Sequence, residues 1–214
     1  MISIEQFSRT SIQNGPYRQP QRRHVVFGLA TMLASIATRT QAFAQEGDIP
    51  DFQSDRYQFT ILRPRQFLPP TRLFGLDGKT TDLSSLHGRP ILLNFWATWC
   101  PACRVELPIL DRLQGEHRHT GLQVLAVSEG RDERASVERF INKLKILNLP
   151  IYLDPNGFVA FSDIENARNA PFALYGMPIT YVIAASGWIV GYMPGAADWS
   201  SAAAASVIEF LRRS

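Results

Sequence analysis

Two cysteines, Cys100 and Cys103, stand two residues apart in the run Cys-Pro-Ala-Cys. They lie between an apolar run, residues 91–96, that is typical of a buried strand, and a stretch of helical periodicity that begins near residue 101. Unpaired N–H groups and the macrodipole at a helix N-terminus favour a thiolate there. The spacing therefore predicts a redox-active pair in which Cys100 attacks and Cys103 resolves the mixed disulfide.

Other roles for the pair carry less weight. A structural disulfide would close a very short loop and remove little chain entropy. Structural zinc requires four ligands, and the further candidates are His87, His117 and His119. A copper-binding module that uses the two sulfurs as soft ligands stays open as an alternative. We expect redox chemistry that needs neither a metal nor an organic cofactor.

The elements that must position this pair alternate between strands and helices. The predicted order is ββ–β–α–β–α–β–α–ββ–α, which implies a layered α/β domain. Val105, Ile109 and Leu113 recur at helical spacing in the helix after the cysteines. The expected elements are a hairpin around 76–79, strand 91–96, helix 101–117, strand 122–127, helix 132–146, strand 150–153, a weakly patterned helix within 158–175, a hairpin of 179–184 and 188–192, and helix 200–212.

The N-terminus has the pattern of a targeting segment. A polar stretch ends in Arg22-Arg23, a 13-residue apolar run follows over 25–37, and Ala42 and Ala44 form a small-x-small cleavage pattern. Residues 1–44 are thus predicted to be a signal peptide, of the twin-arginine kind, although the flanking residues depart from the usual motif. An uncleaved membrane anchor is the alternative, but a span needs about 20 apolar residues and this run has 13.

Residues 45–66 are expected to be a tether and residues 67–214 the folded domain, in the periplasm. The net charge of +3 belongs to the leader, which holds five arginines and one acid. The remainder carries 17 basic and 18 acidic residues, a net charge of −1. Without a basic stripe, nucleic-acid binding is not expected.

The run from Asn94 to Pro108, Asn-Phe-Trp-Ala-Thr-Trp-Cys-Pro-Ala-Cys-Arg-Val-Glu-Leu-Pro, resembles the active site of the TlpA/ResA/CcmG group of exported, usually reducing thiol–disulfide oxidoreductases. Weaker resemblances at 75–88, 176–180 and 195–199 extend it from about Pro69 to the C-terminus. The resemblance implies a thioredoxin-like fold: a central mixed sheet flanked by helices, with an N-terminal β-hairpin extension. The chain departs from the family at 158–175, and at 184–186, where the family usually carries an Asp. Both departures leave the choice of substrate open.

By resemblance, Glu106 is an active-site carboxylate. It lies three residues past Cys103 on the same helix face. A partly buried acid there would have a raised pKa and could exchange protons with the thiols; the alternative is an exposed helix glutamate. Asn94 stands where thioredoxins, which this domain resembles, have a buried Asp. Since Asn cannot titrate, proton transfer must use another group.

The resemblance also implies a surface for clients around the disulfide. Pro178 is expected to follow a cis peptide bond in a loop facing the cysteines, with the backbone of Met177 free to pair with an extended client segment. Trp99, Pro101 and Ala102 are the other expected client contacts.

The expected function is electron donation to oxidised protein dithiols outside the cytoplasm. By resemblance, the clients are apocytochrome c or proteins of cytochrome oxidase copper-site assembly. A membrane thiol transporter of the DsbD/CcdA type would supply the electrons. A disulfide-forming oxidase or isomerase of the same fold is the rival enzyme.

Overall fold

The computed structural model describes residues 49–54, 56–130, 132–162 and 170–214. These residues lie within one compact unit, residues 46–214. The leader expected over residues 1–44 lies outside the described ranges. Within those ranges, no helix is both long and apolar enough to cross a membrane.

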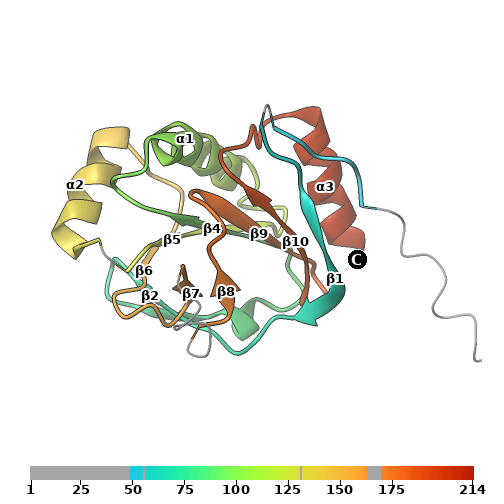
Figure 1. Ribbon diagram of the computed structural model, residues 1–214, viewed down its shortest axis with the longest axis horizontal. Helices are drawn as coiled ribbons and strands as arrows, with labels where there is room; N and C mark the ends of the chain where they lie inside the picture. Colours follow the sequence, from blue (N-terminus) through green and yellow to red (C-terminus); the bar gives the residue numbers. More distant parts are fainter. Residues whose placement is uncertain (1–48, 55, 131, 163–169) are drawn as a thin grey trace, which may run out of the picture. The chain divides into compact units, whose positions relative to one another are not determined.

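An eight-stranded mixed sheet forms the centre of the domain (Figure 1). Its order is β1-β10-β9-β4-β5-β6-β2-β3. β4, β5 and β6 are parallel, while β9 runs antiparallel to β4. The strands are β1 (Thr60–Phe67), β2 (Arg72–Gly75), β3 (Thr80–Asp82), β4 (Ile91–Trp96), β5 (Gln123–Ser128), β6 (Ile151–Leu153), β9 (Ile179–Ile183) and β10 (Trp188–Pro194). The predicted fold class and the hairpin of β2 and β3 are confirmed.

Strand β4 is buried along its whole length, because both faces of the sheet are covered. Its side chains alternate between the faces. Leu92 and Trp96 join the core beneath the helices, and Leu93 and Phe95 join the core on the other face. Such a strand is apolar throughout, which is why the sequence indicated it clearly.

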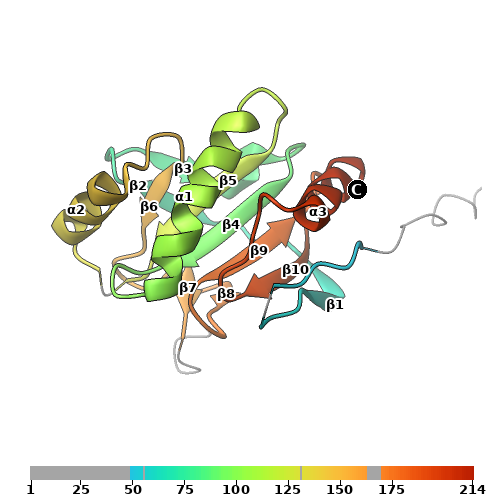
Figure 2. The same ribbon diagram turned by 90° about the horizontal axis from the view of Figure 1, so that it is seen from above.

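Three helices cover one face of the sheet: α1 (Pro101–Glu116), α2 (Arg134–Leu144) and α3 (Ala202–Arg213) (Figures 1 and 2). The opposite face carries a short 3-10 helix, η1 (Leu83–Leu86), and two short parallel strands, β7 (Ala160–Phe161) and β8 (Phe172–Ala173). The expected helix within 158–175 is therefore wrong at both of its ends, and residues 163–169 lie outside the described ranges. The cause is Asp154, whose buried carboxylate accepts the backbone N–H groups of residues 158–160 and holds the turn that leads into β7.

The apolar face expected for α1 is also corrected. Val105 is 66% exposed, whereas Cys103, Glu106, Leu107, Leu110 and Leu113 are buried. The expected stripe of Val105, Ile109 and Leu113 overlaps a second apolar stripe that contains Leu107 and Leu110. The second stripe faces the sheet. This rotation carries Glu106 into the core.

The expected tether over residues 45–66 is corrected at its C-terminal end. Residues 60–67 form β1, an edge strand paired with β10. Phe52 is 3% exposed and packs against Trp199 with a ring-centroid distance of 5.0 Å. The exposed edge carries Arg63, Pro64 and Arg65. Charges and proline are typical of edge strands. Here they interrupt the apolar alternation by which a strand is predicted from the sequence.

Candidate active site

The two cysteines form a disulfide at the N-terminus of α1, with their Cα atoms 5.4 Å apart. Cys100 is the N-cap residue, and its Sγ accepts the backbone N–H of Cys103 at 3.1 Å. Pro101 occupies the first helical position, where its missing N–H leaves no bond unmade. After reduction, the same N–H group and the helix dipole would stabilise a thiolate at Cys100.

The residues expected to contact clients lie around this helix end. Trp99 is 53% exposed, Pro101 is exposed and Ala102 is half-buried. The Met177–Pro178 peptide bond is cis. Pairing of Phe95 with Ile179 places the start of β9, and therefore Pro178, at the end of the sheet where β4 leads to the disulfide.

Glu106 is 1% exposed, and its carboxylate binds three donors. Oε2 accepts the side-chain amide of Asn94 at 2.9 Å. Oε1 accepts the backbone N–H of Ala197 at 3.0 Å and the indole N–H of Trp199 at 2.9 Å. Thus Asn94, singled out from the sequence, and Glu106 belong to one buried network, which continues from Asn94 to the Thr180 hydroxyl at 2.9 Å.

Burial raises the pKa of Glu106 from 4.5 to about 7, although its three hydrogen bonds act in the opposite direction. A group that titrates near neutrality can both accept and return a proton at the pH where thiols exchange. Glu106 lies one turn beyond Cys103 on the buried face of α1. The arrangement places a carboxyl that titrates near neutrality on the same buried face of α1 as Cys103.

Sequence reasoning missed Ala197 and Trp199 as partners of Glu106. They follow β10, more than 90 residues further along the chain. The segment 195–199 was noticed only as a weak resemblance, and no local pattern indicates where an indole N–H points. Burial of Glu106 itself could have been found from its spacing with Leu110 and Leu113.

A cavity of about 480 Å³ lies beside Glu106. Its walls come from α1, from the segment before α3 and from the turn that precedes β1. Lining residues include Tyr57, Val105, Glu106, Ile109 and Asp198. Glu106 is thus part of the wall of this cavity, although the residue is only 1% exposed.

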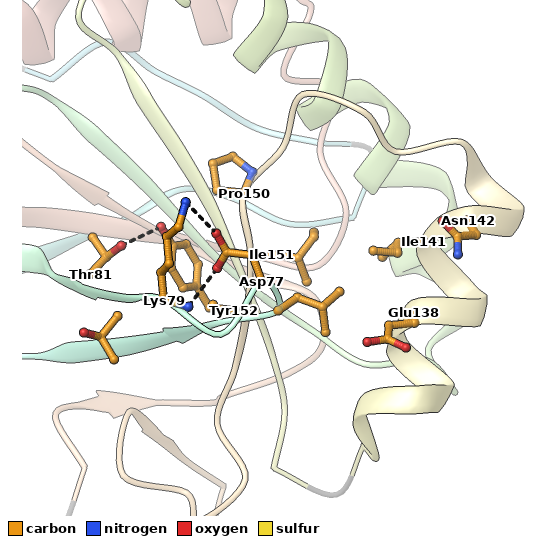
Figure 3. A pocket seen from close by; sticks show the side chains of 12 residues that line it. Asp77, Lys79, Thr81, Glu138, Ile141, Asn142, Pro150, Ile151 and Tyr152 are labelled. Carbon is orange, nitrogen blue, oxygen red and sulfur yellow. Dashed lines mark hydrogen bonds and ion pairs between the residues drawn. The ribbon is translucent and has the colours of Figure 1, made fainter.

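A larger cavity, about 600 Å³, lies between the β2–β3 hairpin, β6 and α2 (Figure 3). Two pairs of its polar groups interact: Lys79 Nζ lies 3.6 Å from Asp77, and the Thr81 and Tyr152 hydroxyls are 3.1 Å apart. No cysteine lines it. Size therefore does not identify the reactive site in this domain.

The histidines considered as zinc ligands lie away from the cysteines. His117 is the C-cap residue of α1, at the opposite end of the helix from Cys100, and His87 stacks on Phe67. Over the described ranges, no group of three or more His, Cys, Asp or Glu side chains could hold a metal ion.

Comparisons with known proteins agree with this geometry. The AhpC/TSA family matches residues 64–191. Thiol-disulfide oxidoreductase ResA of Oceanobacillus iheyensis is 36% identical over 121 residues, which are 56% of this chain and 57% of that protein. Thioredoxin-like protein YneN of Bacillus subtilis is 33% identical over 125 residues, 58% of this chain and 67% of that protein. A ResA of Halalkalibacterium halodurans is matched over 44% of its length, so the chain spans about half of these ResA proteins.

Two solved structures share the fold. The exposed lipoprotein thioredoxin Etrx1 of Streptococcus pneumoniae has a TM-score of 0.53 and 27% identity, covering 68% of this chain and 100% of that one. A secreted thiol-disulfide isomerase of Corynebacterium glutamicum has a TM-score of 0.58 and 20% identity, covering 75% of this chain and 96% of that one. With its thioredoxin-like sheet and a disulfide at the start of α1, the chain belongs to the AhpC/TSA family of the thioredoxin superfamily.

Proposed function

We propose that this protein is an exported thiol–disulfide oxidoreductase that reduces disulfides in client proteins. The observation that carries the proposal is the Cys100–Cys103 disulfide at the N-terminus of α1, with the buried carboxylate of Glu106 one turn beyond it. The names of the ResA and YneN relatives support the same chemistry.

The reaction begins from the dithiol. The Cys100 thiolate attacks one sulfur of a client disulfide, so that a mixed disulfide forms and the other client sulfur leaves as a thiolate. Cys103 then loses its proton and attacks the Cys100 sulfur. The second client thiolate leaves, and the Cys100–Cys103 disulfide of the described structure is produced. Two electrons pass to the client, and a separate thiol donor must return the protein to the dithiol form.

Glu106 supports the second step by taking the proton from Cys103. With a pKa of about 7, the carboxyl is divided between its two forms near neutrality. It can therefore accept the proton during attack and release it through the adjoining cavity. Asn94 cannot serve in its place, since an amide does not titrate.

The finer assignments follow the family resemblance. The proposed clients are apocytochrome c or proteins of cytochrome oxidase copper-site assembly, and the proposed electron donor is a membrane thiol transporter of the DsbD/CcdA type. The predicted leader and the exposed-lipoprotein description of Etrx1 support export, and the proposed location is the periplasm. Exposure of Trp99 and Pro101 beside the disulfide supports a protein client, because an exposed apolar surface suits an extended polypeptide.

The test is covalent trapping with single-cysteine variants in the periplasm. Cys103→Ser should accumulate mixed disulfides with its clients, since Cys100 attacks but nothing resolves the product. Cys100→Ser is the matched control and should accumulate few. Equal adducts from both variants, or adducts with Cys100→Ser alone, would contradict the assigned roles; copper bound by the purified wild-type pair would favour the metal-binding alternative.

A further inference from the structure

The loop that joins β4 to α1 carries Cys100, and Thr98 in this loop is bound to the rest of the domain by its backbone and its side chain. The Thr98 backbone N–H donates to Asp132 Oδ2 at 2.7 Å, and its hydroxyl donates to Asp132 Oδ1 at 2.6 Å. Its carbonyl accepts Arg104 Nη2 at 3.5 Å. All three polar groups of Thr98 are therefore bound by residues outside the loop, two positions before the attacking sulfur.

Asp132 is itself anchored to the sheet. Its Oδ2 also accepts the Ser128 hydroxyl at 2.9 Å, at the last residue of β5. In the parallel pair, Ser128 lies opposite Trp96, the last residue of β4. Both strands end at the same edge of the sheet, where α1 and α2 begin (Figure 2). The carboxylate thus ties the β4–α1 loop to the end of β5.

The position of Asp132 in the chain does not require it to cap its own helix. It lies one residue before Glu133, the N-cap residue of α2, and it is the N-cap side chain that commonly accepts the first N–H groups of a helix. Here α2 begins at Arg134, and its N-cap residue, Glu133, makes no side-chain capping bond. Both Asp132 oxygens serve the neighbouring loop instead.

We propose that Asp132 is a positioning residue for Cys100: its carboxylate holds the loop so that the attacking sulfur sits at the N-terminus of α1. The inference rests on the proposed function for its consequence in catalysis, but the positioning itself concerns only the thiol. Without the clamp, the loop moves and Cys100 leaves the N–H group of Cys103, which lies 3.1 Å from its sulfur.

Positioning and simple charge predict opposite shifts. A negative charge near a thiol raises the thiol pKa, so loss of the Asp132 charge alone would lower the pKa of Cys100. Loss of positioning removes the helix N-terminus from the thiolate and raises that pKa toward the ordinary value of about 8.5. The direction of the shift therefore separates the two effects.

The experiment measures the alkylation rate of Cys100 with iodoacetamide against pH in the reduced full-length protein. Asp132→Ala should raise the pKa of Cys100 and slow its alkylation at pH 7 by up to about 30-fold, because a thiol with a pKa of about 8.5 is still roughly 3% thiolate at that pH. Asp132→Asn should stay within about threefold of the wild type, because its oxygen can accept from Thr98 and Ser128 while its amide donates to the Thr98 hydroxyl. Thr98→Val, which loses one of the bonds, should slow alkylation by about fivefold.

Asp111→Ala is the matched control. Asp111 Oδ1 accepts three consecutive backbone N–H groups, from residues 147–149, and clamps a loop in the same way but away from the cysteines. This variant should melt at a lower temperature and keep the wild-type pKa of Cys100. An unchanged or lowered pKa of Cys100 in Asp132→Ala, or an equal rise in Asp111→Ala, would overturn the proposal. If Asp132→Ala fails to fold, Thr98→Val becomes the deciding variant. An unchanged pKa of Cys100 in Thr98→Val would then overturn the proposal.

The same measurement distinguishes this inference from the proposed function. Alkylation needs no client. The dependence of the Cys100 alkylation rate on pH therefore tests positioning by Asp132 even if the wild-type protein reduces no client disulfide. A wild-type protein that is inactive toward client disulfides would contradict the proposed function alone.

Discussion

Replacing Glu106 with glutamine removes an ionisable group from the core while keeping its shape. The introduced side chain can still accept the N–H groups of Ala197 and Trp199 through its oxygen. Its amide nitrogen would face Asn94, whose Oδ1 has no hydrogen-bond partner among the described residues. If the Asn94 amide turns over, that oxygen can accept from both the introduced amide and the Thr180 hydroxyl. We therefore expect the variant to fold.

The effect on stability follows from the two pKa values of Glu106. Its pKa is 4.5 when unperturbed and about 7 in the folded state. Between these values the folded protein holds a proton that the unfolded chain has lost. The stabilising contribution of the raised pKa is therefore complete below pH 4.5 and is lost as the pH rises to about 7. At about 1.4 kcal/mol per pH unit, Glu106 makes the folded state about 3 kcal/mol less stable at the upper end of this range.

The assay is urea unfolding of the oxidised wild type and of Glu106→Gln from about pH 4 to pH 8, a range that brackets both pKa values. The cysteines do not titrate while the disulfide is intact. Other ionisable groups cancel in the difference between the two proteins. Wild-type stability relative to the variant should fall by about 3 kcal/mol across the range. A difference that stays constant would refute the raised pKa.

Three further predictions follow from the site and the leader. Glu106→Gln should slow client reduction near neutral pH, because Cys103 loses its proton acceptor; superimposable rate–pH profiles would make Glu106 a structural residue only. Phe52→Ala should cost about 3–5 kcal/mol in urea unfolding, since this ring is 3% exposed, and a change below about 1 kcal/mol would show that the segment before β1 is dispensable. Replacing Arg22 and Arg23 with lysine should abolish periplasmic accumulation, measured by fractionation; normal accumulation would reject the twin-arginine route.

The elements around the cysteines could be predicted because their sequence signals are local. Residues 91–96 are apolar throughout, and the Cys-Pro-Ala-Cys run marks where strand gives way to helix. Both predictions agree with the structure, with boundaries shifted by at most one residue. The hairpin of β2 and β3 was equally visible, since Asp-Gly separates two short strand-like runs.

The errors arose where tertiary contacts decide the outcome. β1 forms because β10 offers a partner strand, although its own residues carry charges and a proline. The Asp154 carboxylate replaces a helix with the turn that leads into β7 by binding N–H groups four to six residues ahead. Likewise, nothing local to Glu106 indicates the Trp199 indole, and nothing local to Asp132 indicates Thr98 on another loop.

The central claim is that the Cys100–Cys103 pair donates electrons to client disulfides. Its most direct test is the reduction potential of the pair, measured by equilibration with defined thiol–disulfide buffers. A reductant should have a potential near or below that of cytoplasmic thioredoxin, about −270 mV, so that electrons flow from the pair to clients. A potential near about −120 mV, typical of a disulfide-forming oxidase, would contradict the claim.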